Sequence, residues 1–224
     1  VSGKAFRVII DFHTHVFPPE LIGARSSLCD AEPAFASLYR SPEARLVAAD
    51  DLLRVMDEDG VQKSVIFGFP WESPDLYRRQ NDYIMEAVER YKGRFIGFCA
   101  FSPLSSNGAS EVERCLRQGL SGVGELAVYQ SGLTDEVSAG LKEVMSVCAG
   151  LDAPLLLHAN EPVGHEYAGK APMTLGQIYR FIKAYPLNRI VLAHWGGGLF
   201  FYTLMKKEVR EVLKNVWFDT AASP

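Results

Sequence analysis

Apolar and polar positions divide the chain into two alternating kinds of segment. Short runs with few polar residues, such as Leu155–His158, are typical of strands that are buried on both faces. Longer segments, such as Pro74–Lys92, repeat apolar residues every three or four positions, and Gly93 then stops the pattern, as expected of an amphipathic helix. Strand and helix follow each other in turn, which predicts a parallel sheet covered by helices.

Seven strands can be predicted in this way. They are Arg7–His13, Ser64–Phe69, Phe95–Phe101, Gly122–Val128, Leu155–His158, Ile190–His194 and Val216–Asp219. The predicted helices are a segment that Asp50 starts and Gly60 ends, Pro74–Lys92, Ser110–Leu120, Thr134–Ala149, Thr174–Tyr185 and Leu199–Lys214. This repeat favours an α/β fold of the TIM type, a (β/α)8 barrel, over an open sheet. Because an eighth strand is not found in the 224 residues, we expect a barrel that lacks its last strand-helix unit.

One stretch interrupts the repeat. Residues 16–49, between the first strand and the first predicted helix, are rich in proline and serine. We expect an irregular loop there, with room for one short helix, inside a single domain spanning residues 1–224. Loops of this length in compact domains usually form lids or contact substrates.

Polar residues gather at the carboxyl ends of the predicted strands. The first strand runs into Asp11-Phe12-His13-Thr14-His15, and alternation of side chains puts His13 and His15 on one face. The other strand-end residues are Glu125, His158, His194 and Asp219. In a TIM barrel all of these ends meet at the active-site face, so we expect these side chains to lie together.

These residue types point to metal chemistry. His13, His15 and His158 are predicted to hold a divalent cation through neutral imidazole nitrogens, and a carboxylate would complete the ligand set. Glu125 could orient a histidine, bind substrate or pair with a cationic side chain. His194 could be a ligand, accept a proton or hold an oxyanion, and we take it, with Asp219, as a candidate catalytic residue. Zinc is the expected ion, with manganese or magnesium as alternatives, and one or two ions are expected.

Four residues are predicted to contact substrate. Trp71 follows the second strand, Asn160 shares a face with His158, His165 lies in the loop after the fifth strand, and Trp195 follows His194. Trp71 could equally be packed in the core at the barrel rim. Tyr129 is a further candidate for the pocket wall.

Net charge and composition limit the classes of molecule that the protein is expected to bind. The net charge is -4 and no basic tract is present, which argues against nucleic acid or an anionic membrane as a partner. The four cysteines are far apart and are expected to be free or buried thiols in a reducing compartment. No apolar run has the length of a membrane span and no signal segment is seen, so we expect a cytoplasmic protein that acts on a small molecule. Barrels of this kind often pair through helix faces, so a homodimer is one option.

Several motifs together resemble a known group. The pair His13-x-His15, Gly124-Glu125-Leu126, His158, His194-Trp195-Gly-Gly-Gly and Trp217-Phe218-Asp219 resemble the amidohydrolase superfamily, in its amidohydrolase-related branch. That branch contains lactonases, other hydrolases and non-oxidative decarboxylases such as aminocarboxymuconate semialdehyde decarboxylase. The resemblance implies a distorted TIM barrel in which His13, His15 and His158 match metal ligands and His194 matches the catalytic histidine. The last ligand in the family is an aspartate on strand eight, whereas Asp219 matches strand seven. In some branches of the superfamily a carboxylate on strand four bridges two metals, so the resemblance implies that Glu125 could do the same.

We therefore predict a metal-dependent hydrolase in which activated water attacks an ester, lactone or amide of a small carboxylated molecule. The alternatives are a non-oxidative decarboxylase of an aromatic or unsaturated acid, a TatD-like deoxyribonuclease, and a barrel that binds metal without turnover.

Overall fold

Seven parallel strands form one curved sheet. The computed structural model describes residues 8–222 of the chain. The strands are β1 (Ile10–His15), β2 (Lys63–Phe67), β3 (Phe95–Cys99), β4 (Gly122–Leu126), β5 (Leu155–Leu157), β6 (Ile190–Leu192) and β7 (Val216–Phe218). Each strand pairs with the next one along the chain, in the order β1 to β7. This is the TIM-type arrangement predicted from the sequence. Arg7, the predicted start of the first strand, lies outside the described residues.

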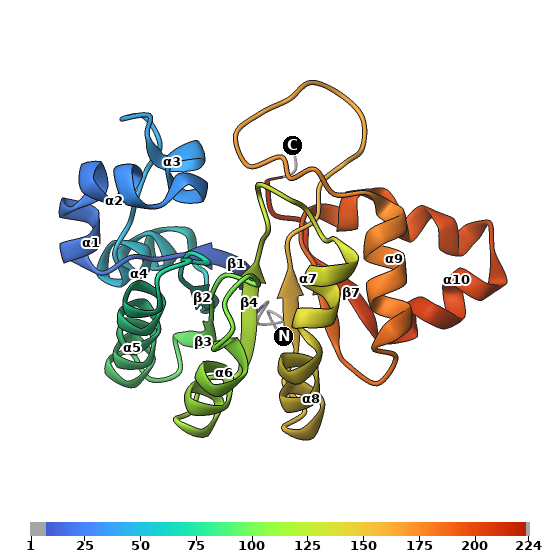
Figure 1. The fold of residues 1–224 in the computed structure, drawn as a ribbon. Helices are drawn as coiled ribbons and strands as arrows, with labels where there is room; N and C mark the ends of the chain where they lie inside the picture. The colour runs from blue at the N-terminus through green and yellow to red at the C-terminus, as the bar shows by residue number, and fades with distance from the viewer. Residues whose placement is uncertain (1–7, 223–224) are drawn as a thin grey trace, which may run out of the picture.

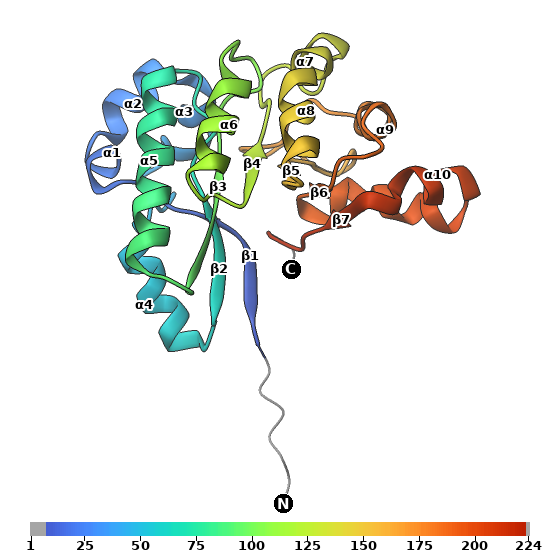
Figure 2. The same ribbon diagram turned by 90° about the horizontal axis from the view of Figure 1, so that it is seen from below.

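Helices connect the strands and cover the outer side of the curved sheet (Figure 2). They are α1 (Pro19–Gly23), α2 (Arg25–Ala31), α3 (Pro33–Tyr39), α4 (Ala49–Asp59), α5 (Pro74–Arg90), α6 (Gly108–Arg117), α7 (Asp135–Gly140), α8 (Lys142–Gly150), α9 (Leu175–Ala184) and α10 (Lys207–Val212). Gly60 ends α4 in the left-handed conformation, as predicted. Thr174 and Gln177 form a capping box at the start of α9. The helix predicted to start at Ser110 starts instead at Gly108, so Ser110 lies inside α6, where its hydroxyl donates to the carbonyl of Asn107 and does not cap the helix.

The alternation of strand side chains explains why the strands are almost wholly apolar. In β5, Leu156 belongs to an inner cluster with Val65, Phe67, Phe98 and Val191. Its neighbours Leu155 and Leu157 belong instead to the outer core, where the helices pack. Both faces of the sheet are therefore buried, which is the condition under which strands lose their polar alternation.

The stretch 16–49 is more regular than the sequence suggested. It contains the three short helices α1, α2 and α3, which lie at the same end of the sheet as the loop that follows β5 (Figure 1). Pro19 and Pro33 occupy the first positions of α1 and α3, where a missing N–H is harmless. Leu28 and Phe35 are buried against the core, so tertiary packing supplies the stability that such short helices lack in isolation.

The chain turns sharply after β6. His194, Trp195 and the three glycines that follow all have φ between +53° and +91°. Only glycine adopts this left-handed region without strain, which accounts for the run Gly196–Gly198. The long helix predicted from Leu199 is absent from the described residues, because the segment His194–Leu204 forms this turn and then 3₁₀ turns, and α10 starts only at Lys207.

Two expectations from composition can be compared with the fold. All four cysteines are buried free thiols, as predicted. Between residues 8 and 222, no helix combines the length and apolarity that crossing a bilayer requires.

Candidate active site

Glu125, at the end of β4, is the centre around which the histidines gather. Its side chain is only 2% exposed. Oε2 lies 3.6 Å from His13 Nε2 and 3.3 Å from His15 Nε2. Oε1 lies 2.9 Å from His158 Nδ1 and 3.6 Å from His194 Nε2. The strand ends β1, β4, β5 and β6 thus bring together the residues that the sequence analysis placed in one site.

Fixed acceptors orient three of the four rings. His15 Nδ1 donates to the carbonyl of Gly68 at 3.1 Å, and His194 Nδ1 donates to the carbonyl of Ala221 at 2.9 Å. His13 Nδ1 donates to Asp219 Oδ2 at 2.8 Å. A carbonyl oxygen can only accept, so Nδ1 must carry the proton in these rings, and Nε2 of the neutral ring is left with a lone pair.

These Nε2 lone pairs face a carboxylate, so the centre needs positive charge. One way to supply it is to protonate the rings. Burial alone would lower the pKa of His13, but its hydrogen bonds to Asp219 and Glu125 raise that pKa to about 10. Burial likewise opposes a raised pKa at His194, and the hydrogen bond with Glu125 outweighs it. Burial would raise the pKa of Glu125, yet the histidines around it hold that pKa well below its usual range.

The other source of positive charge is a divalent cation, and the donor set fits one. Nε2 of His158 is buried and has no hydrogen-bond partner among residues 8–222. A buried polar atom left without a partner in a native fold needs an explanation, and an ion supplies one. Ligand atoms of His13, Glu125 and His194 lie within 4.8 Å of one another. Imidazole nitrogens with a carboxylate are typical ligands of zinc and manganese sites.

Asp219 contacts two of the histidine residues, His13 and His194. Besides His13, it accepts hydrogen bonds at Oδ1 from the backbone N–H of His194 at 2.9 Å and of Ala221 at 3.1 Å. These bonds, with that from His13, hold the pKa of Asp219 below its usual range although burial would raise it. Asp219 is not among the residues that line the histidine cavity. Its contacts suit a residue that orients ligands.

A cavity of about 680 Å³ opens over the centre. Its lining includes all four strand-end histidines and Glu125. The remaining lining residues come from α3, from the chain after β4, from the loop after β5 and from the chain after β7; they are Leu38, Tyr39, Tyr129, Glu161, Tyr167, Ala168, Gly169, Ala221 and Ala222. The loop after β5 and the helices α1–α3 lie at the same end of the sheet (Figure 1), as expected for an active-site face. The volume suits a small organic molecule.

None of the four residues predicted to contact substrate is among the residues that line this cavity. Trp71 is fully buried, and its indole N–H donates to Gln80 at 3.2 Å, so it belongs to the core. Asn160 is buried and accepts the N–H of Ala171 at 2.9 Å, which ties the loop after β5 together. His165 is exposed in that loop. Trp195 is half exposed and its ring lies beside Phe200.

The sequence analysis missed Leu38, Tyr39 and Glu161. Leu38 and Tyr39 lie in α3, inside the stretch that was expected to be irregular. A signal was present, because Pro33 is followed by Phe35 and Tyr39, four positions apart, as on one face of a helix. Glu161 follows Asn160 directly and carries no distinguishing pattern.

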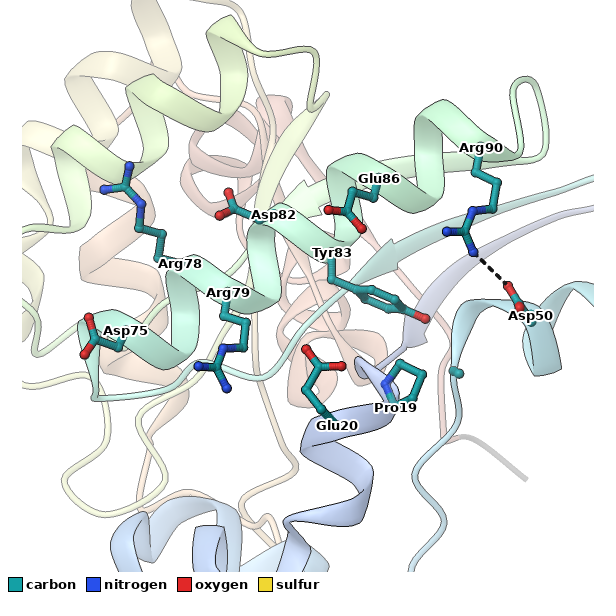
Figure 3. A pocket seen from close by; sticks show the side chains of 11 residues that line it. Pro19, Glu20, Asp50, Asp75, Arg78, Arg79, Asp82, Tyr83, Glu86 and Arg90 are labelled. Atoms are coloured by element: carbon teal, nitrogen blue, oxygen red, sulfur yellow. Dashed lines mark ion pairs between the residues drawn. The ribbon is translucent and has the colours of Figure 1, made fainter.

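A second hollow, of about 640 Å³, lies on the outer face of α5. Figure 3 shows charged side chains of both signs around it, including Arg78, Glu86 and an ion pair of 3.9 Å between Arg90 and Asp50. It has no lining residue in common with the histidine cavity. Its mixed charges resemble a solvated helix face, so the chemistry belongs to the histidine cavity.

Comparison with known proteins places this geometry in a family. Gamma-resorcylate decarboxylase of Polaromonas sp. is 26% identical in an alignment 220 positions long, and the alignment covers 80% of this chain and 64% of that relative. The chain therefore spans just under two thirds of the relative's length.

Solved structures share the fold. The 5-carboxyvanillate decarboxylase of Sphingomonas paucimobilis superposes with a TM-score of 0.72 at 18% identity, covering 95% of this chain and 80% of that one. The 5-carboxyvanillate decarboxylase of Novosphingobium aromaticivorans, solved with manganese, gives 0.68 at 19% identity, covering 91% and 69%. Residues 10–223 match the Amidohydrolase family model. With its histidine-lined barrel end, the chain belongs to the amidohydrolase family of enzymes.

Proposed function

We propose that this chain carries the active site of a metal-dependent, non-oxidative decarboxylase of a hydroxylated aromatic acid. The observation that carries the proposal is the cavity, in which a centre of four histidines and Glu125 forms the floor and tyrosines form a wall. Such a cavity suits a flat ring whose carboxylate points to the floor. The name of the curated relative supports the same reaction class. Hydrolysis, the reaction predicted from the sequence alone, is the second candidate.

His13, His15 and His158, with Glu125, would hold the cation, which we propose to be manganese or zinc. When bound, a divalent cation supplies a Lewis acid that neutralises negative charge on substrate oxygens. Asp219 and the carbonyl of Gly68 would keep His13 and His15 in the required tautomer through the hydrogen bonds described above.

His194 is the residue we propose to move the proton. Its side chain is 25% exposed, the most open of the four, and it lines the cavity. Because Nδ1 is held by Ala221, a second proton on the ring would sit on Nε2, which faces Glu125 and the cavity. His194 would give this proton to the ring carbon that bears the carboxylate. The bond from that carbon to the carboxylate then breaks, its electron pair stays in the ring, and carbon dioxide leaves.

The cavity wall would hold the ring during this exchange. Tyr129 lies with its ring centroid 5.2 Å from that of His158 and stacks on Phe69 at 6.1 Å. A planar substrate that contacts this wall has its reacting carbon close to the histidines. Positioning of this kind lowers the barrier without any chemical contribution from the wall.

The test is turnover of 2,6-dihydroxybenzoate, the ligand of one structural neighbour, by manganese-loaded protein in heavy water. We expect one carbon dioxide per product and one deuterium at the ring carbon that lost the carboxylate. The variant His194→Asn should lose activity by about 10²- to 10⁴-fold. The variant His165→Asn is the matched control, because His165 lies outside the cavity lining, and it should keep its activity.

A hydrolase would give a different result. Uptake of labelled oxygen from water into the product of an ester or lactone, with no carbon dioxide from any hydroxylated aromatic acid, would overturn the proposal in favour of hydrolysis.

A further inference from the structure

The cavity has a floor and a wall of different character. The floor consists of the histidines and Glu125. The wall beside this charged floor consists of Leu38 and Tyr39 from α3, Tyr129 after β4, and Ala168 and Gly169 from the loop after β5, with the Tyr129 ring centroid 5.2 Å from that of His158. Three segments that are far apart in sequence therefore meet in one wall that is apolar apart from two phenol hydroxyls.

These segments are in contact with one another. A Cβ added to Gly169 would lie 3.7 Å from a methyl of Leu38 and 4.0 Å from the ring of Tyr129. Tyr39 and Tyr129 each lie 6.1 Å, between ring centroids, from the buried ring of Phe69. The wall is thus built on the aromatic core, so its shape is fixed before a ligand arrives.

Apart from the histidines, the charged side chains that line the cavity are all acidic. Apart from the histidines, its ionisable lining consists of the carboxylates of Glu125 and Glu161 and three tyrosines, with no lysine or arginine among the lining residues in the described part of the chain. Lys170 is next to the lining residue Gly169 in sequence, but its ammonium group already interacts with other acceptors. Its ammonium group is 3.4 Å from Glu161 and donates to the carbonyls of Val163 and His165 at 3.1 Å and 3.3 Å.

A substrate carboxylate at the floor meets histidines, whereas one at the wall meets only apolar groups and phenols, with Glu161 at the rim. An anion transferred from water to such a wall loses hydration, and no lysine or arginine among the described lining residues contacts it as a counterion. Phenol hydroxyls can, by contrast, exchange hydrogen bonds with a ring hydroxyl of the substrate.

Building on the proposed decarboxylase function, we propose that the wall formed by Leu38, Tyr39 and Tyr129 selects aromatic acids with a single carboxylate and rejects those with a second one. Hydroxyl groups at the far side of the ring are accepted. The selected substrates are hydroxylated monocarboxylates, and the rejected ones are dicarboxylates of the same ring.

The test compares two acids that differ in one group. Salicylate carries one carboxylate, and 4-hydroxyisophthalate is salicylate with a second carboxylate para to its hydroxyl. Dissociation constants for the manganese-loaded protein are measured by calorimetry at low temperature, before turnover. We expect salicylate to bind about tenfold or more tightly than the dicarboxylate, as one uncompensated charge implies.

Substitutions at three positions, Leu38, Glu161 and Tyr129, locate the effect. Leu38→Arg places a cation in the wall and should tighten dicarboxylate binding about tenfold, whereas Leu38→Gln, of similar length without the charge, should not. Glu161→Gln removes a rim carboxylate and releases Lys170, so it should tighten dicarboxylate binding as well, and it leaves the wall itself unchanged. Tyr129→Phe keeps the ring and removes the hydroxyl, so it should weaken a dihydroxylated acid more than salicylate.

The outcomes separate this inference from the function on which it rests. Equal or tighter binding of the dicarboxylate by the unchanged protein overturns the selectivity, even if decarboxylation is observed. Selective binding without release of carbon dioxide upholds the selectivity and removes the proposed reaction. Binding of neither acid overturns the selectivity, and the turnover assay then decides the reaction separately.

Discussion

His13 Nδ1 and Asp219 Oδ2 are joined by a hydrogen bond of 2.8 Å across 206 residues of sequence. The bond links the first and the last strand of the described sheet. The other carboxylate oxygen of Asp219 accepts the backbone N–H of His194. One carboxylate therefore sets the ring orientation of one candidate ligand and the backbone position of the proposed proton donor.

The variant Asp219→Asn tests this positioning role. An amide cannot accept at both of its side-chain atoms, so His13 loses either its tautomer or its orientation. We expect metal affinity, measured by competition with a chromogenic chelator, to fall by about 10- to 100-fold. Asp135→Asn, on the exposed surface of α7, is the control. Unchanged metal affinity in Asp219→Asn would show that the bond is dispensable.

A buried network on α6 predicts the pH dependence of stability. Glu111 accepts from Arg114 at 2.7 Å and 2.8 Å and from Asn81 at 2.9 Å. Burial would raise the pKa of Glu111, but these bonds lower it below 4.5. A lowered native pKa stabilises the protein fully above the pKa of the unfolded chain, and this stability is lost as pH falls through the native value.

We therefore expect the contribution of Glu111 to the free energy of unfolding to be constant from pH 7 to 5 and to decline below about pH 4.5. The variant Glu111→Gln should lower stability at pH 7 and flatten the acid decline, as measured by urea unfolding at a series of pH values. Glu113→Gln, which breaks an exposed pair with Arg117, is the matched control. A decline equally steep in Glu111→Gln and in the unchanged protein would assign acid sensitivity to other groups.

Glu32 connects the segment of the three short helices α1–α3 to the start of α5 through hydrogen bonds. Its buried carboxylate accepts the backbone N–H groups of Glu72 and Ser73, at 3.1 Å and 3.0 Å, at the start of α5. The variant Glu32→Ala leaves both donors without a partner and should lower the free energy of unfolding by about 1–2 kcal/mol. Glu43→Ala, at an exposed position of the same stretch, should change it little. Proteolysis within residues 16–49 should speed up only in Glu32→Ala.

Gly197 allows the turn after β6 to approach the loop after β5. Its φ is +60°, and an added Cβ would overlap the carbonyl oxygen of Asn160. We expect Gly197→Ala to lower the free energy of unfolding by about 2–4 kcal/mol, from left-handed strain and overpacking together. Gly176→Ala, in α9, where an added Cβ would make only ordinary van der Waals contacts, should instead be neutral or stabilising. Equal melting temperatures for the two variants would refute this explanation.

The parts of the fold that could be predicted were those that a local pattern determines. The strand ends carrying His13 and His158 followed from apolar runs that stop at a polar residue, and Glu125 stood out as the one charged residue in the apolar segment Gly122–Val128. The approximate limits of α5 and α9 followed from periodic apolar residues and, for α5, from Pro74 at its start and Gly93 after its end. Such signals act over a few residues, so a single sequence contains them completely.

Other parts depend on distant partners. The helices α1–α3 are too short to be stable alone, and Glu32 and Phe35 hold them through contacts that their own sequence does not reveal. Trp71 follows a strand, as a pocket residue would. Its indole N–H nevertheless donates to Gln80, and its ring packs in the hydrophobic core. Tyr39 reaches the cavity only because α3 folds over it. A single sequence identifies which side chains have a given chemistry but cannot decide which of them face the cavity.

The burial of Glu125 has a consequence for how the chain folds. Its four histidine neighbours come from β1, β5 and β6, so its charge is compensated only when these strands have joined β4. A partly folded chain that buried this carboxylate without them would incur the desolvation cost of an unpaired ion. Intermediates with an incomplete sheet are therefore disfavoured, and the reactive centre makes the folding of the described sheet more cooperative.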